Sequence, residues 1–564
     1  MASPLSHPAS QTVDPAELPP AGEVMTSEAL SRLKACRLSF IQSLLRRMIR
    51  ERWQIERVRW ELDDEGRGLA VYRITAPAHA WHLIIFSDHL LEDEQEERIV
   101  ATRWDVMAAL VEGDLADERI EALRAQIPFV IDGRMDPDCL MWCRANRSLR
   151  VFEHTVDRLS DGLQPDLDLV AEAGYLMRTL DFRANGLNGS RPLLAHSREH
   201  PLRGPYFAQM LGSFVIRQFS FDLVEDLARR RSPGAATLRG DVARYLGVGN
   251  SSGVGIVLFL LAQPHLLNRW LELRFTALAR IRARPSDEQP GRDRFDALLE
   301  RRIRYAEEDE TDYKGAFTPG ATVARELGDV GALLAGGAAG ATWGAVLDRV
   351  AETIDPETLQ ALHALLIEAH PELTDDLAEH LVVEELPGRP PAMTAGAMLE
   401  LLEREFGWAL ATPAEDPDER YFFWYKSEEN EEPRLGVRGM EFGEDLTIDT
   451  VGDAHRLAAA LRSLPSETPL AEVLLRNPGT RQMAERTWAA RGRRYHTPHL
   501  NSIARSFWPI DSIRTVLSGL YGLEKLGPMS DLWVRAVMMQ GAPTAAEIAA
   551  GTSEDWMYPA RPRA

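Results

Sequence analysis

The spacing of apolar residues changes twice in the first 130 residues. Between residues 26 and 51 apolar side chains recur at helical spacing, and Thr26 or Ser27 can cap the helix. Apolar and polar positions then alternate over 58–62, and after the turn at 63–66 apolar residues gather in two further short segments, 69–74 and 81–86, as is typical of strands. The pattern predicts a helix followed by a small antiparallel sheet, and helical spacing returns from about residue 95 to 126.

From about residue 150 onward the spacing is almost wholly helical. Helices are predicted over 164–180, 204–231, 254–283, 355–370, 376–385, 396–405 and 468–476. Asp355-Pro356 and Thr468-Pro469 each combine a capping side chain with a proline in the first turn. The aromatic run 421–425, with 434–438 returning beside it, predicts one late hairpin. The expected fold class is therefore mainly α: a helical body with a small antiparallel β-sheet near the N-terminus and a late β-hairpin.

A chain of 564 residues is too long for a single hydrophobic core, so several packed regions are expected. Composition and breaker residues divide it into six segments. They are a disordered tail (1–24), an α+β region (25–150), a central helical region with glycine-rich loops (151–285), a mobile linker (286–320), a helical region (321–410) and a hairpin with C-terminal helices (411–564).

Charge and composition narrow the range of partners. The formal net charge of −22 argues against nucleic acid or an anionic membrane as the main partner, because phosphate binding needs a basic surface. The uncharged stretch 330–347 holds five glycines between Asp329 and Asp348, which favours close helix contact over membrane insertion. The N-terminus lacks the features of a secretory signal, and three cysteines are too few for a disulfide framework. A cytoplasmic location is expected.

Two polar, glycine-rich segments are candidate ligand-binding loops. In the first, Gly249, Asn250, Ser251 and Ser252 precede an apolar run, and free N–H groups at a helix start favour an anion. The alternative is a plain capped helix start. In the second, spanning 178–191, Arg178 and Asn185 are candidate contacts to a carboxylate or phosphate. The alternative there is a solvated connecting loop.

A polar segment near the C-terminus contains the candidate catalytic residues. His499 is the candidate base, Tyr495 a candidate proton carrier and Asp511 a candidate orienting group. No metal site is predicted, because Cys139 and Cys143 lack further ligands. The histidines 79, 82 and 89 are spread over both faces of one predicted strand, although Asp88-His89 at the strand end is a minor catalytic candidate.

Two hypotheses follow from these features. The first is a cytoplasmic enzyme acting on a small anionic metabolite, bearing a carboxylate or phosphate, by acid–base chemistry. The second is a non-catalytic helical scaffold, assembly factor or regulatory binding protein. Neither the reaction class nor a cofactor can be deduced from the sequence, and a homo-oligomer is compatible with it.

Overall fold

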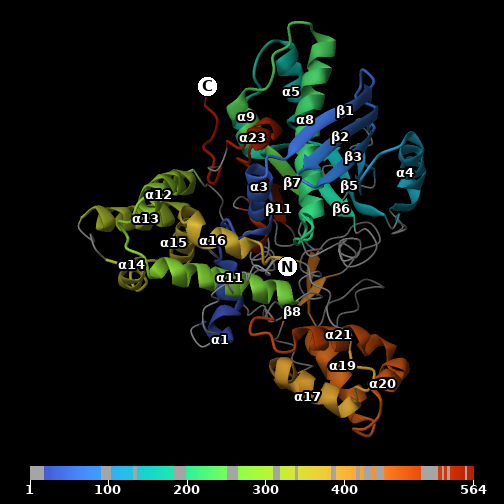
Figure 1. The fold of residues 1–564 in the computed structure, drawn as a ribbon, viewed down its shortest axis with the longest axis vertical. Coiled ribbons are helices and arrows are strands. Elements are labelled where there is room, and N and C mark those ends of the chain that lie inside the picture. Colours follow the sequence, from blue (N-terminus) through green and yellow to red (C-terminus); the bar gives the residue numbers. More distant parts are fainter. Residues whose placement is uncertain are drawn as a thin grey trace, which may run out of the picture.

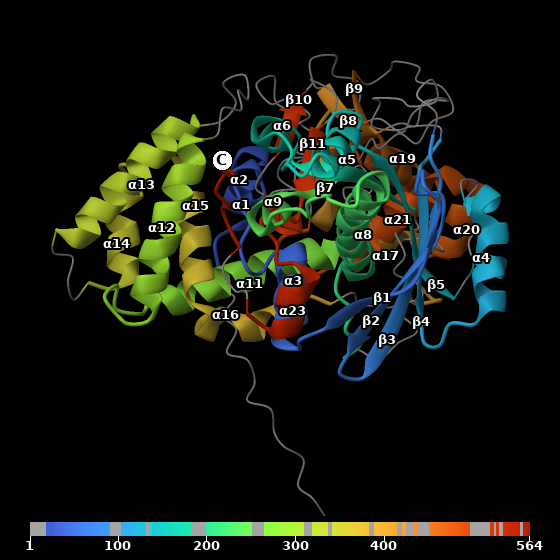
Figure 2. The same cartoon turned by 90° about the horizontal axis from the view of Figure 1, so that it is seen from above.

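The computed structural model describes residues 18–90, 103–130, 136, 138–182, 199–250, 264–308, 318–336, 341–382, 389–413, 420–424, 433–437, 450–496, 519–523, 526–529, 534–552 and 556–563. Three masses are visible in Figure 1: a sheet with its covering helices, a helical lobe beside it and a second helical lobe below. The N-terminal helices lie between the sheet and the first lobe (Figure 2).

The expectation of a small sheet is wrong, because strands from both ends of the chain form one nine-stranded mixed sheet. In sheet order the strands are β1 (Gln54–Leu62), β2 (Gly68–Ala76), β3 (His79–Ser87), β4 (Val106–Glu112), β5 (Cys139–Arg147), β6 (Tyr175–Phe182), β7 (Gly247–Asn250), β11 (Val534–Met538) and β10 (Leu526–Met529). All neighbours run antiparallel except β6 and β7, which are parallel. The antiparallel β1–β3 segment confirms the three strands predicted near the N-terminus.

The missed strands lack the alternation that marks a half-exposed strand. Every residue of β5 is buried, because helices cover both faces of the sheet at this point. Strand β6 lies within the predicted helix 164–180, of which only α6 (Leu167–Ala173) is helical. Gly174, with a φ of 75°, ends that helix in the left-handed conformation, and the chain then enters the sheet.

Helix α8 (Phe207–Arg231) packs along one face of the sheet and confirms the helix predicted over 204–231. Most of its residues between Phe207 and Ala228 are buried, including the polar Arg217, as expected for a helix enclosed by its neighbours. Further helices lie on the same side of the sheet as α8: α3 (Phe40–Arg50), α5 (Phe152–Ser160), α9 (Gly240–Tyr245) and α23 (Ala545–Ala550). Helix α4 (Asp117–Val130) covers the other face, where a smaller apolar cluster forms.

The first lobe contains six helices among its described residues. They are α11 (Pro264–Arg282), α12 (Gly291–Glu307), α13 (Gly320–Ala335), α14 (Trp343–Val350), α15 (Pro356–Ala369) and α16 (Pro371–Ala378). Helix α12 lies inside the segment expected to be a linker, and its Phe295, Leu298 and Leu299 enter the main core. The Asp355 side chain caps α15 as predicted, accepting from the Glu357 N–H.

The second lobe has its own apolar core. Its elements are α17 (Ala395–Glu405), α18 (Gly407–Ala411), α19 (Thr450–Arg462), α20 (Leu470–Arg476), a short 3₁₀ turn (Pro478–Thr480) and α21 (Arg481–Ala490). The hairpin of β8 (Arg420–Trp424) and β9 (Pro433–Val437) confirms the late hairpin. The predicted Thr468 cap does not form, since Pro469 occupies the N-cap of α20 without a side-chain bond.

The N-terminal segment holds these parts together. The helix predicted over 26–51 is interrupted and forms α2 (Ser27–Ser31) and α3, since Ser39 accepts from the Cys36 N–H and donates to the Gly519 carbonyl. A short helix, α1 (Ala21–Val24), precedes them at the end of the segment expected to be a disordered tail. The stretch 330–347 likewise divides between α13 and α14. None of the described helices combines the length and apolar character that a bilayer crossing requires.

A histidine–glutamate–histidine site at one end of the sheet

Three polar side chains from distant parts of the sequence meet at the end of the sheet where β3 begins and β4 ends. His79 is the first residue of β3 and Glu112 the last of β4, and Trp81 is the register partner of Glu112. Strand alternation places His79, Trp81 and Glu112 on the face that α8 covers. His200, seven residues before α8 begins, approaches from that covering layer.

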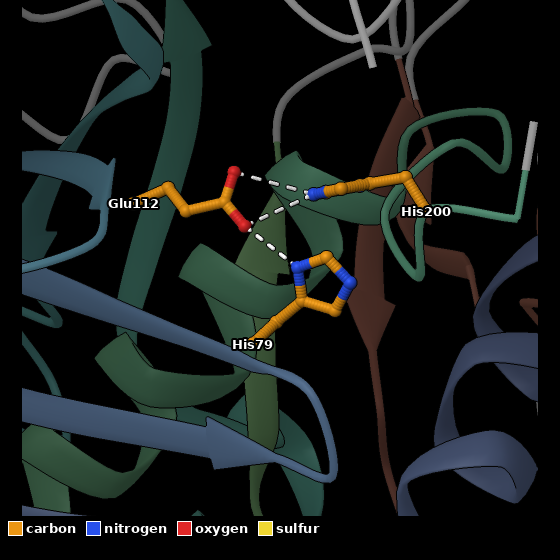
Figure 3. A group of neighbouring side chains, drawn as sticks. All are labelled: His79, Glu112 and His200. Carbon is orange, nitrogen blue, oxygen red and sulfur yellow. Dashed lines mark hydrogen bonds and ion pairs between the residues drawn. The ribbon is translucent and has the colours of Figure 1, made fainter. Parts of the chain in front are cut away.

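The three side chains are within hydrogen-bonding distance of one another, as Figure 3 shows. His79 Nδ1 lies 2.8 Å from Glu112 Oε1. His200 Nε2 lies 3.2 Å from Glu112 Oε1 and 3.3 Å from Oε2. The carboxylate thus accepts from both imidazole rings.

Backbone contacts determine which nitrogen of His200 carries the proton. The Leu202 N–H donates to His200 Nδ1 over 3.2 Å, so Nδ1 must offer a lone pair. The proton of the neutral ring is therefore on Nε2, where it faces Glu112. With the other donated proton on His79 Nδ1, an ionised Glu112 matches every donor with an acceptor, and the trio is a complete hydrogen-bonded network.

Aromatic rings hold the histidines in place. His79 stacks on Trp81 with ring centroids 5.6 Å apart, and Trp81 stacks in turn on Trp53 at 5.1 Å. The His200 ring meets the His79 ring edge-on at 4.7 Å. Because Trp53 and Trp81 are fully buried, this stack restricts rotation of the His79 ring.

Exposure differs within the trio. The His200 side chain is only 2% exposed, whereas His79 and Glu112 are 30% and 24% exposed. His79 Nε2 points away from the carboxylate (Figure 3) and has no hydrogen-bond partner among the described residues. The site therefore combines a buried histidine, His200, with a partly exposed one, His79, whose Nε2 points away from Glu112.

The two glycine-rich segments begin on two neighbouring strands of the sheet. Arg178 on β6 is the register partner of Gly249 on β7, so the predicted loops 178–191 and 247–255 leave from neighbouring strands. Through β5, Thr179 is level with Val106, the first residue of β4, and Arg178 lies one residue further from Glu112. The described end of β7, Asn250, pairs with Thr179, so these residues lie toward the end of β4 opposite to Glu112.

The glycines of the first segment have a packing role. A Cβ on Gly247 would lie 2.2 Å from the Met538 carbonyl oxygen, and one on Gly249 would lie 2.9 Å from Arg178 Cβ. Gly247 and Gly249 therefore allow β7 to fit between β6 and β11. This explains the two glycines without a ligand. Residues 247–250 form a strand, whereas the rest of the predicted segment lies outside the described residues.

The other predicted site residues are placed as follows. Asn185, Ser251, Ser252, His499 and Asp511 lie outside the described residues, and Asn250 is described only as the last residue of β7.

Tyr495 is buried, its N–H donates to Asn268 Oδ1 and its hydroxyl donates to the Pro19 carbonyl. Its described contacts are thus with α11 and the N-terminal segment, and a catalytic role for it stays a prediction.

The minor candidate His89 and the buried thiol of Cys139 can be compared with the trio. His89 Nδ1 lies 3.9 Å from Glu65 Oε2 at the opposite end of β3. Cys139 is fully buried, and burial raises the pKa of its thiol to about 12, so it is a poor nucleophile. In the part of the chain that the structure describes, the close cluster of histidine and carboxylate side chains is that of His79, Glu112 and His200.

Sequence reasoning missed Glu112 and His200. Glu112 could have been found if residues 106–112 had been predicted as a strand antiparallel to β3, because the last residue of such a strand lies beside the first residues of β3. No local signal identifies His200, because it lies 88 residues from Glu112 and is placed by tertiary packing.

Comparison with protein-family models, curated proteins and solved structures found no match to this chain. Function must therefore be argued from the site itself.

Proposed function

We propose that the protein is an enzyme in which His79 acts as a general acid–base on a small ligand bound at this end of the sheet. The observation that carries the proposal is the Glu112–His79 contact of 2.8 Å, with the second ring nitrogen directed away from it. A carboxylate that accepts from one imidazole nitrogen fixes the tautomer, so the other nitrogen offers its lone pair to a substrate proton.

The other two residues have supporting roles in this proposal. Glu112 orients the His79 ring and stabilises the imidazolium that forms when His79 takes a proton. His200 donates to the same carboxylate and keeps it in position, as a buried residue can do because its neighbours restrict its movement.

We propose a carboxylate- or phosphate-bearing metabolite as the substrate class, because arginine side chains and glycine-rich loops favour such anions. Arg178 is level with the start of β4, at the opposite end of that strand from Glu112, so the sequence pattern and not the geometry of the trio supports this class. We also propose a cytoplasmic location, since the cysteines at 36, 139 and 143 are all free and buried.

The test is to incubate the purified protein with a protein-free cell extract and follow its metabolites by mass spectrometry. At least one metabolite should be consumed by the wild type, and His79→Ala should slow that turnover by about 10²–10⁴-fold.

His82→Gln is the matched control, because His82 is three residues away on the opposite face of β3. Turnover that His79→Ala leaves unchanged would contradict the proposal. An extract in which no metabolite changes would favour a scaffold.

A further inference from the structure

We propose that His79, Glu112 and His200 also bind one divalent transition-metal ion of the Zn²⁺ type, and that this binding switches off His79 as a base. The binding is argued from geometry alone, whereas its inhibitory effect rests on the proposed function.

The donor atoms are already close to the spacing that a metal ion needs. One atom from each of the three side chains can be chosen so that all lie within 4.8 Å of one another. His79 Nδ1 and His200 Nε2 lie 2.8 Å and 3.2 Å from the same oxygen, Glu112 Oε1. In a tetrahedral zinc site the ligand atoms lie about 3.3 Å apart. The two distances to Glu112 Oε1 are within about 0.5 Å of this value, and the two nitrogens lie at most 4.8 Å apart, so small side-chain movements would admit an ion.

The types of donor atom select the class of metal. Two imidazole nitrogens and one carboxylate oxygen suit zinc and its transition-metal neighbours, whereas Mg²⁺ and Ca²⁺ prefer oxygen ligands throughout. The single negative charge of Glu112 offsets part of the ion's charge. Because His79 and Glu112 are partly exposed, a fourth position stays open to water.

Metal binding requires each of the two histidine rings to move its proton to its other nitrogen. The ion replaces the two protons that now face Glu112, so each ring must carry its proton on the other nitrogen. For His79 this is the outward Nε2, which water can reach. For His200 it is Nδ1, which now accepts from the Leu202 N–H, so that single hydrogen bond is lost as the ion gains three ligands.

The consequence for His79 follows directly from this redistribution. A proton on Nε2 removes the lone pair that the proposed general base would use. An ion in the trio and a substrate proton on His79 are therefore mutually exclusive.

The test uses the full chain, stripped with a chelator and titrated with ZnCl₂ against a chromogenic competitor. The wild type is expected to bind one tight Zn²⁺ per chain and to unfold at a higher temperature when it is loaded. His79→Ala should weaken this binding by more than the 10–100-fold typical of losing an outer-shell partner, and His82→Gln should not. A cooperative thermal unfolding transition of each metal-free variant shows that the variant is folded.

The outcomes separate the two proposals. Zn²⁺ binding that is absent, or equal in wild type and His79→Ala, overturns the metal site and leaves the proposed enzyme function standing. Zn²⁺ that binds through His79 and stops metabolite turnover supports both. Turnover that needs the bound Zn²⁺ confirms the metal site and overturns the role of His79 as a free base.

Discussion

At the scale of single residues, burial decides how an ionisable side chain behaves. His370 is buried at the start of α16, where its Nδ1 donates to the Leu366 carbonyl over 2.8 Å and its ring meets Trp343 edge-on. Burial is the main cause that lowers the pKa of His370 below its usual value of 6.5. The native state therefore resists protonation of this ring more than the unfolded chain does.

This difference predicts an acid sensitivity. Because the folded pKa of His370 lies below 6.5, the unfolded state binds more protons as the pH falls below that value, and stability is lost. His370→Asn should unfold more easily at pH 8 but lose less stability between pH 6.5 and pH 5 than the wild type. Urea denaturation at several pH values measures this.

The exposed His380→Gln is the matched control, expected to follow the wild type at every pH. Parallel curves for His370→Asn and the wild type across this range would contradict the role of burial.

At the scale of elements, close backbone approach explains several glycines better than ligand binding does. Strand β7 is only four residues long and has neighbours on both sides. Its first residue, Gly247, lies so close to the Met538 carbonyl oxygen that a Cβ at this position would clash with it. A local sequence pattern cannot distinguish such a strand from a glycine-rich loop, since both need residues without a Cβ.

Gly247→Ala is accordingly expected to destabilise the protein by about 1–3 kcal/mol or more, because the new Cβ would meet a backbone atom that cannot turn aside. The free energy of unfolding from urea denaturation checks this. Gly240→Ala, at the start of α9, is the matched control, as a Cβ there has no neighbour within 4 Å. Equal stability of the two variants would contradict the packing role of Gly247.

At the scale of the whole molecule, the N-terminal segment connects parts that are distant in sequence. Lys34 pairs with Glu357 of α15, and Arg37 Nε donates to Asp375 of α16 over 2.7 Å. Arg494, just beyond α21, donates to the Leu18 carbonyl over 2.8 Å. Residues 18–37 therefore contact both helical lobes, and their ion pairs span more than 300 positions of the chain.

The buried pair offers a test of this connection. Lys34→Met leaves the Glu357 carboxylate buried without its cation, which typically costs about 3–5 kcal/mol. The double variant Lys34→Met with Glu357→Leu should recover part of this loss, because it removes the uncompensated charge. Urea denaturation of the three proteins measures both effects.

Arg50→Met is the matched control, since Arg50 and Glu379 are exposed and 3.7 Å apart. Its expected cost is at most about 1 kcal/mol. If the Lys34→Met protein is as stable as the Arg50→Met protein, the buried Lys34–Glu357 ion pair does not connect the N-terminal segment to α15 in the way proposed.

What the sequence alone determined is the part of the fold that local patterns encode. Strand β1 alternates because one side of it is largely polar, and β2 and β3 are recognisable by their apolar, β-branched and aromatic residues between turns. The Asp355 cap marks the start of α15, and α8 is recognisable by its length. The late hairpin follows from the aromatic run and its return segment.

What only the tertiary structure decided is everything that depends on contacts between distant segments. The buried strands β4, β5 and β6 lose the alternation that would reveal them, and β10 and β11 join the sheet only through β7. The trio of His79, Glu112 and His200 has no motif, because its spacing in sequence is set by the intervening elements. Its geometry exists only once α8 has packed onto the sheet.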